Sequence, residues 1–389
     1  MSNHIQVGVI GSAQVSPANL NQASLEEILN TLTHAALKNA GMTIDDIDGI
    51  VVAACDQLDG RAISIMAASG SVGGVGRDIL STPSGSEHAF ILGALRVKSG
   101  MYKTQLVLSW SPLEVDSICE IQKLSNDPYY HRALPQDDLS TYALQAGVLE
   151  SEVSGVRESV IKFTQQSREK GRVAYPNISA TPVQEVQIRD SKMLRWPITE
   201  GMVCEPRFGA VAMVLSNQDW IKDKQIKNPA WIHGMGWATE TTYLGDRNLS
   251  DMGSLKAAAH QAYHESGISD PKSAFDVVEV SDPTGYQALL SLDGLGLCDS
   301  KDWRDAVHSD RFSSKGSLPV NLSGGATSFN PVFCTGLLRL AEAANQVRGC
   351  AGAHQKSGVR KSLGHGSSGF AMQYNSVVVF ANLPKENQL

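Results

Sequence analysis

The sequence contains an internal repeat. Residues 32–52 and residues 255–280 each show a helix with an Ala-rich face at i, i+3, i+4 spacing, then a short acidic turn and an apolar strand. Each helix ends at a glycine, Gly41 or Gly267, which is typical of a helix C-terminus. An apolar, glycine-punctuated segment precedes each copy, IQVGVIGSA in the first and AWIHGMGWA in the second.

The similarity between the copies continues downstream. In the first, a Gly/Ser turn is followed by a helix from Ala89 to Lys98, a stop at Gly100 and the strand TQLVLSW. In the second, LSGGATSFNPVFCTG is followed by a helix through Val347, a stop at Gly349 and the strand NSVVVFANL. Strands that alternate with helices predict an α/β protein in which helices cover both faces of the sheets. Two copies of the same order indicate an ancient duplication.

The boundary between the copies is predicted in the polar stretch IKDKQIKNPA, residues 221–230. We therefore expect an N-terminal half at 1–225 and a C-terminal half at 226–389. An insertion at about 110–200 interrupts the first half with the loop LSNDPYYHRALPQDD and the amphipathic helix LESEVSGVRESVIKFTQQSREK. Such an insertion either covers a site or lies on the surface without contributing to one, and the sequence leaves both interpretations open.

Composition excludes several classes of function. The net charge of −7 and the absence of a long Lys/Arg run argue against nucleic-acid binding. No stretch of about 18 uninterrupted apolar residues exists, so no membrane span is expected. The N-terminus lacks a basic region followed by an apolar run, so no secretory signal is expected. Six scattered cysteines without a CxxC pair predict reduced, mostly buried thiols in a cytoplasmic protein, with no metal site.

Residues 80–94, LSTPSGSEHAFILGA, place a Gly/Ser/Pro-rich turn at the start of a helix. Backbone N–H groups at a helix N-terminus favour a nucleophile or an oxyanion. The turn contains Ser81, Thr82, Ser84 and Ser86 but no cysteine, and no base stands directly beside the serines.

Three longer stretches carry a family resemblance. LPVNLSGGATSFNPVFCTGLLRLAEAANQVRG resembles the thiolase stretch L-P-V-N-x-x-G-G-x…G-H-P-x-G-A-x-G…E-A…Q-L-R-G. ITEGMVCEPRFGAVAMVLS resembles the stretch that closes the first thiolase half, and FDVVEVSDPTGYQALLSLDGLGLC resembles V-E-x-H-D-x-F of the sterol-carrier-protein-x type and archaeal branches. Over nearly its whole length the chain thus resembles the thiolase superfamily. The resemblance implies the thiolase fold, a five-layered α/β/α/β/α arrangement of two duplicated halves, normally dimeric.

The residues that thiolases use are mostly replaced at the matching positions. The position of the nucleophilic cysteine falls at Thr82 or at Pro83, depending on the alignment of the turn. The histidine of G-H-P is Asn330, and the histidine of H-D-x-F is a serine that precedes Asp282. The last Gly-rich segment, SLGHGSSG, keeps His365 near the position of the second acid. Acyl transfer through a cysteine is therefore not expected, and Cys334 is interpreted as a packing residue.

The remaining groups could still stabilise an enolate. Asn330 and the backbone N–H groups of residues 84–86 could donate to a thioester oxygen, and His365, Tyr286 or His88 could move a proton. A retro-aldol cleavage of a 3-hydroxyacyl thioester needs no more than this, and some members of the sterol-carrier-protein-x branch work in this way. We predict His365, Tyr286 and Asn330 as catalytic. The predicted substrate-binding residues are Thr82, Ser84, Ser86, His88, Asp282, Gly324, Gly325 and Gly366. Segments 82–86, 281–286, 328–331 and 363–369 are expected to converge on one pocket.

Two functions remain open from the sequence. The first is an enzyme that makes or breaks a carbon–carbon bond in a coenzyme A or carrier-bound thioester, with coenzyme A as part of the substrate and not as a permanently bound cofactor. The second is a non-catalytic thiolase-like subunit of an acyltransferase or aldolase complex. The resemblance implies a homodimer or a thiolase-like heterodimer, paired through the strand TQLVLSW, and a small zinc-ribbon/OB-fold protein as a further partner. The acyl group is not identified.

Overall fold

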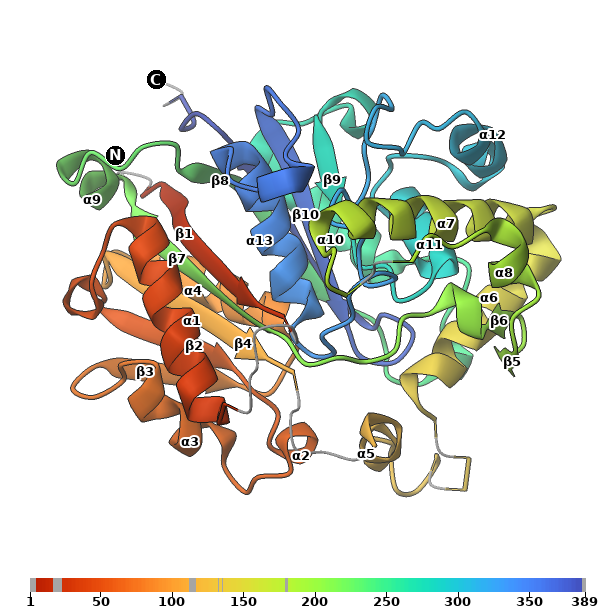
Figure 1. The fold of residues 1–389 in the computed structure, drawn as a ribbon, viewed down its shortest axis with the longest axis horizontal. Coiled ribbons are helices and arrows are strands. Elements are labelled where there is room, and N and C mark those ends of the chain that lie inside the picture. The colour runs from red at the N-terminus through yellow and green to blue at the C-terminus, as the bar shows by residue number, and fades with distance from the viewer. Residues whose placement is uncertain are drawn as a thin grey trace.

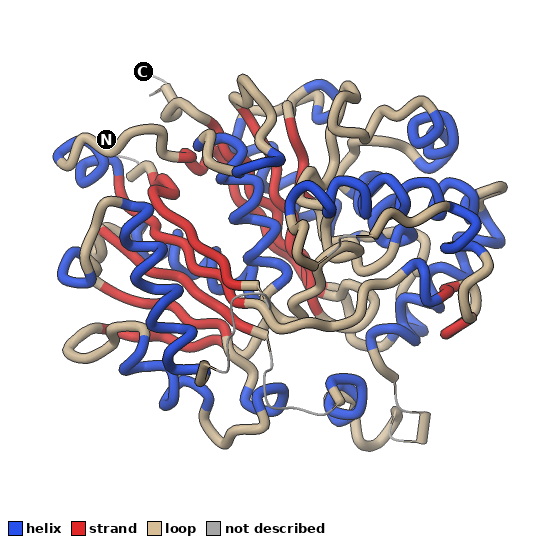
Figure 2. Tube along the Cα trace, in the orientation of Figure 1, coloured by secondary structure: helices blue, strands red, loops and turns tan. Residues whose placement is uncertain are grey.

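The computed structural model describes residues 5–16, 23–111, 117–131, 133–134, 136–178 and 181–386. Its centre is a nine-stranded mixed sheet with the strand order β3-β2-β4-β7-β1-β8-β11-β10-β9 (Figure 1). A separate two-stranded sheet pairs β5 with β6. Figure 2 shows helices on the faces of the strands, as expected for an α/β protein.

The first half supplies five strands of the large sheet. Its strands are β1 (Val7–Val15), β2 (Gly49–Ala53), β3 (Asp78–Thr82), β4 (Thr104–Trp110) and β7 (Ala210–Asn217). Its helices are α1 (Leu25–Ala40), η2 (Ile44–Asp46), α2 (Asp56–Asp59), α3 (Ser64–Ser71), α4 (Ser86–Lys98) and α9 (Gln218–Asp223). Helix α1 begins with a capping box between Ser24 and Glu27 and ends at Gly41, whose φ of 69° is left-handed.

The second half repeats this order. Its strands are β8 (Ala230–Thr239), β9 (Val277–Glu279), β10 (Lys361–Ser368) and β11 (Tyr374–Ala381). Its helices are η4 (Leu244–Asp246), α10 (Gly253–Ser266), η5 (Pro271–Ser273), α11 (Gly285–Gly294), η6 (Ser300–Asp302), α12 (Trp303–His308), α13 (Thr335–Arg348) and η7 (Gly352–His354). Strands β9 and β10 are parallel as β2 and β4 are, and β8 takes the place of β1. Because β1 also pairs with β8, the two halves form one continuous sheet.

The helices and strands form five layers. Helices α1 and α3 pack together on the outer face of the first half, and α10 and α11 on that of the second half. Helices α4 and α13 contact each other between the two groups of strands. Alternate strand residues face different layers. In the first half, Ile50 faces the outer core and Val51 faces the central core. In the second half, Val377 faces the outer core and Val378 faces the central core. The predicted five-layered α/β fold is confirmed.

The insertion packs against the second half although it interrupts the first. It contains α5 (Ile118–Leu124), α6 (Asp138–Glu152), α7 (Val156–Ala174), α8 (Glu185–Arg189), β5 (Met193–Arg195), β6 (Ile198–Thr199) and η3 (Glu200–Met202). Helix α7 contacts α11 and α12, and α6 contacts α11 (Figure 1). The domain boundary near residues 221–230 stays a prediction; this stretch includes the end of α9 and the start of β8.

The structure corrects one expectation about strand edges. The strand TQLVLSW is β4, and it is buried and paired on both sides, with β2 and with β7. It therefore offers no free edge for a second subunit. The edge strand of the first half is β3, which is mostly exposed and pairs only with β2 among the described strands. The error arose because the sequence gives the order of strands along the chain and not their order in the sheet.

Candidate functional site

The N-termini of α4 and α13 meet at the centre of the molecule. The Ser86 Oγ accepts a hydrogen bond of 2.9 Å from the backbone N–H of Leu337. The turn that leads into α4, Thr82–Ser86, is called the serine turn here. Within it, the Oγ atoms of Thr82 and Ser84 lie 2.8 Å apart. Thr82 and Ser86 are buried and Ser84 is half-buried, so Ser84 is the most accessible of the three hydroxyls.

Glu87, in the first turn of α4, is a buried carboxylate that the sequence analysis missed. It is 1% exposed, and its Oε1 accepts a hydrogen bond of 2.7 Å from Ser368 Oγ on β10. Three glycines from separate segments, Gly85, Gly336 and Gly366, surround it so closely that a Cβ on any of them would collide with Glu87. The sequence did contain a signal for Glu87, because it is a charged residue at the start of a helix that otherwise has mainly small and apolar residues.

Helix α6 carries two further titratable groups, Asp138 and Tyr142. Burial, with the charge of Asp137, raises the pKa of Asp138 to about 7 at the start of α6. Burial raises the pKa of Tyr142 well above its usual range, and the charges of Asp138 and Glu87 add to the effect. Tyr142 is therefore within electrostatic range of both carboxyl groups. It is half-buried, so its side chain keeps some access to solvent.

The turn between β10 and β11 holds α6 against this region. Ala371 and Met372 have φ values of 49° and 55°, in the left-handed region that non-glycine residues rarely adopt. The backbone N–H of Ala371 donates to Thr141 Oγ1 on α6 at 2.9 Å. Arg247 donates to the carbonyls of Phe370 and Ala371 at 2.9 and 2.6 Å. These bonds hold the backbone in its unusual conformation.

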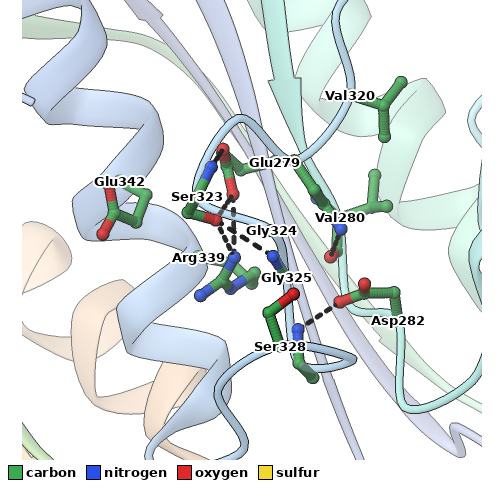
Figure 3. A network of polar contacts seen from close by, with 12 residues as sticks. Glu279, Val280, Asp282, Val320, Ser323, Gly324, Gly325, Ser328, Arg339 and Glu342 are labelled. Atoms are coloured by element: carbon green, nitrogen blue, oxygen red, sulfur yellow. Dashed lines mark hydrogen bonds and ion pairs between the residues drawn. The ribbon is translucent and has the colours of Figure 1, made fainter. Parts of the chain in front are cut away.

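A buried ionic network supports the start of the segment that leads into α13 (Figure 3). Arg339 on α13 donates to Glu279 Oε2 at 2.8 Å, and both side chains are almost fully buried. Ser323 Oγ also donates to Glu279 Oε2, at 2.6 Å, and accepts from the N–H of Gly325 at 3.2 Å. The network fixes the Gly-rich turn 323–325 to strand β9 and to α13.

Asp282, a predicted substrate contact, also holds this turn. Its Oδ1 accepts from the Ala326 N–H at 2.6 Å, and its Oδ2 accepts from Thr327 Oγ1 at 3.1 Å. Burial raises its pKa to about 6, although Arg339 opposes the shift. Gly325 has a φ of 67°, and a Cβ there would collide with the Asp282 carboxylate, which accounts for the glycine. The backbone of Gly324 likewise lies against Gly171 on α7.

His365, which the sequence analysis predicts as catalytic, is enclosed by the protein. His365 is in strand β10 and is fully buried. Its Nε2 lies 2.9 Å from Asn375 Oδ1, and Asn375 in turn donates to Ser254 Oγ on α10. Burial lowers the pKa of His365 to about 4. Because Gly364 and Gly366 face the central helices, His365 between them faces the outer layer, away from Glu87.

Tyr286 is also placed away from the serine turn. It is fully buried on α11, and its hydroxyl donates to Glu150 Oε1 on α6. Burial and the Glu150 carboxylate raise the pKa of Tyr286 well above its usual range. Its neighbour Gly285 packs against Val160 of α7. The structure therefore gives Tyr286 a role in packing α6, α7 and α11, and we revise its assignment as a base.

Asn330 lies at the start of the segment before α13 and is half-buried. Its Nδ2 donates to the Cys204 carbonyl at 3.2 Å, and its own carbonyl accepts from the Arg207 N–H at 3.0 Å. One of its two amide protons is thus engaged by the chain. Its role as an oxyanion donor stays a prediction.

Three of the four predicted segments contact one another. Gly85 in the serine turn lies against Ser368, and the Ser367 N–H donates to Ser281 Oγ at 2.9 Å. Asp282 then contacts the residues just before segment 328–331. His88 extends the contact, because its ring meets Tyr374 edge-on with centroids 5.7 Å apart. A shared pocket stays a prediction, since two cavities of the described chain lie elsewhere, one against α7 and one beside Trp196.

None of the six cysteines lies in the serine turn. Burial raises the pKa of Cys119 and of Cys298 to about 11, and it raises the pKa of Cys204 and Cys350 as well. Cys334 is buried, its thiol pKa is raised strongly by burial, and its Sγ donates to the Gly209 carbonyl next to β7. These surroundings disfavour the thiolate that a nucleophile requires.

Residues 236–382 match the family model "Thiolase C-terminal domain-like". The chain is 26% identical over 233 residues to benzoylsuccinyl-CoA thiolase subunit BbsB of Thauera aromatica, covering 59% of each chain. It is 28% identical over 168 residues to sterol carrier protein 2 of Gallus gallus, covering 42% of this chain and 30% of that protein. The chain thus spans about three fifths or less of the length of these curated relatives.

Two solved structures share the fold. The Ltp2-ChsH2(DUF35) aldolase superposes with a TM-score of 0.81 at 18% identity, covering 97% of this chain and 98% of that chain. A monomeric SCP2-thiolase like protein type 1 from Mycobacterium smegmatis superposes with a TM-score of 0.72 at 16% identity, covering 97% and 78%. The C-terminal part of the chain thus matches a thiolase family model, and the chain is similar in sequence and in fold to thiolase-like proteins. Among these proteins, the chain is similar to sterol carrier protein 2 in sequence and to the SCP2-thiolase like protein type 1 in fold.

Within the described residues, no helix has the length and apolar character needed to cross a membrane.

Proposed function

We propose that this protein acts on a coenzyme A or carrier-bound thioester and makes or breaks a carbon–carbon bond without forming an acyl-cysteine. One observation carries the proposal: helix α4 begins at a turn of hydroxyl residues without a cysteine, and the buried carboxylate of Glu87 lies directly behind it. The helix N-terminus favours negative charge on a thioester oxygen. The carboxylate is a group that can accept a proton.

The reaction is a retro-aldol cleavage of a 3-hydroxyacyl thioester, or its reverse. A base removes the proton of the 3-hydroxyl group, and the bond between C2 and C3 breaks. Its electron pair forms the enolate of the shortened thioester, while C3 leaves as an aldehyde or ketone. The same base then delivers the proton to C2 and is thereby regenerated, so it also exchanges the C2 protons of a thioester without a 3-hydroxyl group. No bond to the protein forms at any step.

We assign the roles within this reaction as follows. Asn330 and the backbone N–H groups of the serine turn stabilise the enolate oxygen. Glu87 accepts the hydroxyl proton, and Ser368, which donates to Glu87 at 2.7 Å, orients it. Tyr142 lies within electrostatic range of Glu87 and is the second candidate for the proton transfer.

The experiment is hydrogen exchange at C2 of a simple acyl thioester. Propionyl-CoA is incubated with the protein in D₂O, and the mass of the thioester is followed. Enolate formation replaces the C2 protons with deuterium, and this requires no knowledge of the natural acyl group. The Asn330→Ala variant should exchange about 10²-fold more slowly, the usual cost of one oxyanion donor. No exchange by the wild-type protein, alone or with a partner subunit, would contradict the proposal.

The second candidate is a non-catalytic subunit of a heteromeric complex. The observation in its favour is the close packing at the start of α4, where Gly85, Gly336 and Gly366 enclose Glu87. One relative is named as a subunit and one neighbour as a two-component aldolase, which supports a partner for this chain as well. A small zinc-ribbon/OB-fold protein remains the partner that we propose for such a complex, beside a homodimer or thiolase-like heterodimer.

A further inference from the structure

A cavity of about 430 Å³ lies between α7 and the segment that follows α13. One face of α7 lines it with residues at i, i+3, i+4 spacing, from Lys162 to Val173. The opposite wall comes from Ser313 and Ser314 and from residues 353–356. Its volume is within the range of sites for small ligands.

This cavity is separate from the region around Glu87. Helix α13 has 14 residues and is therefore about 21 Å long. Its N-terminal end carries Leu337, which bonds to Ser86 in the serine turn. Its C-terminal end leads into η7, where Ala353 and His354 line the cavity. The two places thus lie at opposite ends of the same helix.

A buried ammonium group forms part of the lining. Lys170 is 8% exposed, and its Nζ donates to the carbonyls of Phe312 and Val320 at 3.3 and 2.5 Å. A lysine ammonium has three N–H groups, so one remains beyond these two bonds, and Nζ also lies over the Phe163 ring at 5.6 Å from its centroid. No carboxylate of the described residues forms an ion pair with Lys170. Burial accordingly lowers its pKa to about 8, although the charges of Glu279 and Asp282 oppose the shift.

The other charges leave the lining cationic. Two charged lining residues form ion pairs with residues that are not part of the lining. Lys162 pairs with Glu185 at 3.3 Å, and Glu169 pairs with Arg172 at 2.8 Å. The charges of Lys162 and Glu169 are therefore balanced. His354 bonds to Glu342 Oε2 at 2.8 Å. The half-buried Lys356 makes no side-chain bond to any described residue. Lys170 and Lys356 therefore outweigh the one remaining carboxylate, Asp310, which accepts from Gln166.

Gln166 adds an unsatisfied acceptor. It is 9% exposed, and its Nε2 donates to the Val307 carbonyl and to Asp310 Oδ1 at 3.2 and 2.8 Å. Its buried Oε1 has no hydrogen-bond partner among the described residues, although the side chain lines the cavity. Buried carbonyl oxygens are nearly always paired, so a ligand hydroxyl that reaches this atom after a rotation of the side chain would satisfy it.

We propose that this cavity is a second binding site of the protein and takes a small hydroxylated oxyanion of phosphate or carboxylate type. Lys170 and Lys356 bind the anionic group, and Gln166 Oε1 accepts a hydrogen bond from a hydroxyl of the ligand. Charge-assisted bonds to an oxyanion stabilise the buried ammonium of Lys170, which lacks a carboxylate partner. The proposal does not depend on the reaction at the other end of α13.

Calorimetric titration tests the proposal with three probes: inorganic phosphate, glycerol 3-phosphate and glycerate. We expect saturable one-site binding of glycerol 3-phosphate or glycerate, and the stronger of the two identifies the type of anion. Lys356→Ala should weaken this binding at least 10-fold. Lys227→Ala, which removes the same charge at an exposed position, should not. Gln166→Leu should reduce the preference of glycerol 3-phosphate over inorganic phosphate.

Two results would overturn the proposal. One is the absence of saturable binding of all three probes into the millimolar range. The other is equal binding by Lys356→Ala and Lys227→Ala, since this would indicate non-specific attraction to positive charge. A crystal structure of the wild-type protein with glycerol 3-phosphate provides a measurement that needs no variant. It should show the anion between Lys170 and Lys356, and an empty cavity would count against the site.

Discussion

Glu87 and Ser368 connect the two duplicated halves through one hydrogen bond of 2.7 Å between Oε1 and Oγ. Glu87 belongs to α4 of the first half, and Ser368 ends β10 of the second. The carboxylate is buried, and no cation of the described residues forms an ion pair with it. A buried carboxylate without a cationic partner is costly to maintain, which is typical of groups kept for function.

Glu87→Gln should therefore reduce the deuterium exchange of propionyl-CoA by about 10²-fold or more, the usual contribution of a positioned base. The substitution keeps the shape of the side chain and an acceptor for Ser368, so the fold should persist. Ser368→Ala is the matched control and should have a smaller effect, because it removes only the orienting bond. Full activity of Glu87→Gln would remove Glu87 from the mechanism and favour the subunit role.

No cysteine should carry an acyl group during turnover. Intact-protein mass spectrometry after incubation with an acyl-CoA should show the unmodified mass, because burial raises the thiol pKa of Cys204 and of Cys334. Cys204→Ala should keep its activity, although Cys204 lies beside Asn330. An acyl adduct on Cys55, Cys204 or Cys334 would show that a covalent mechanism operates after all.

The buried Arg339–Glu279 pair gives a prediction about stability. Arg339→Met alone leaves the Glu279 carboxylate buried without its cation and should reduce the free energy of unfolding by about 3–5 kcal/mol. The double variant Arg339→Met/Glu279→Gln removes both charges and should recover a large part of this loss. Urea unfolding monitored by circular dichroism measures both. Equal losses in the single and double variants would mean that the Coulombic pairing is unimportant.

His365 should make stability depend on pH. Its folded pKa of about 4 lies below its ordinary value of 6.5, so the unfolded chain binds the proton more tightly. Stability is unaffected above pH 6.5 and falls as the pH decreases from 6.5 to 4. At pH 5 the loss from this group is about 2 kcal/mol, at about 1.4 kcal/mol per pH unit.

His365→Gln should remove this dependence, because glutamine can still donate to Asn375 and does not titrate. The difference in unfolding free energy between the variant and the wild type should shift in favour of the variant between pH 7.5 and pH 5. Urea unfolding at both pH values measures the shift. A difference that is the same at both pH values would show that His365 is not the group responsible.

The exposed edge of β3 should mediate self-association if the protein is a dimer. Leu80 on β3 is 38% exposed, and Met66 and Val75 nearby in the sequence are 71% and 81% exposed. Leu80→Lys should convert a dimer to a monomer in light scattering, because a charge on an edge strand opposes pairing. Leu383→Lys, at an equally apolar but separate position, is the control. A wild-type monomer would agree with the monomeric neighbour and contradict our expectation of a dimer.

The sequence predicted the fold well because the pattern of the two copies is local and repeated. Gly41 and Gly267 end α1 and α10 in left-handed conformations, as the C-terminal signal indicated. The helices predicted from Ala89 to Lys98 and through Val347 are α4 and α13. The order of the strands in the sheet could not be predicted from the sequence, because the residues of a strand do not indicate which strand lies beside it. For this reason β4 was predicted to be an edge strand.

The site was predicted less well for a related reason. His365 and Tyr286 were selected by residue type and by position near a glycine, but a side chain in a strand or helix can face either side. One residue of register decides that Gly366 faces Glu87 while His365 faces α10. Glu87 was overlooked because acidic residues in a first helical turn are common, and its enclosure by three glycines exists only in three dimensions.

The pairing of β1 with both β7 and β8 has a consequence for synthesis on the ribosome. Strand β1 is made before both of its partners, which begin about 200 residues later, at Ala210 and Ala230. Until they emerge, an apolar strand has neither neighbour and both its edges are open. The growing chain must therefore keep β1 from pairing with other chains until β7 and β8 arrive in turn, and contacts this distant in sequence form slowly.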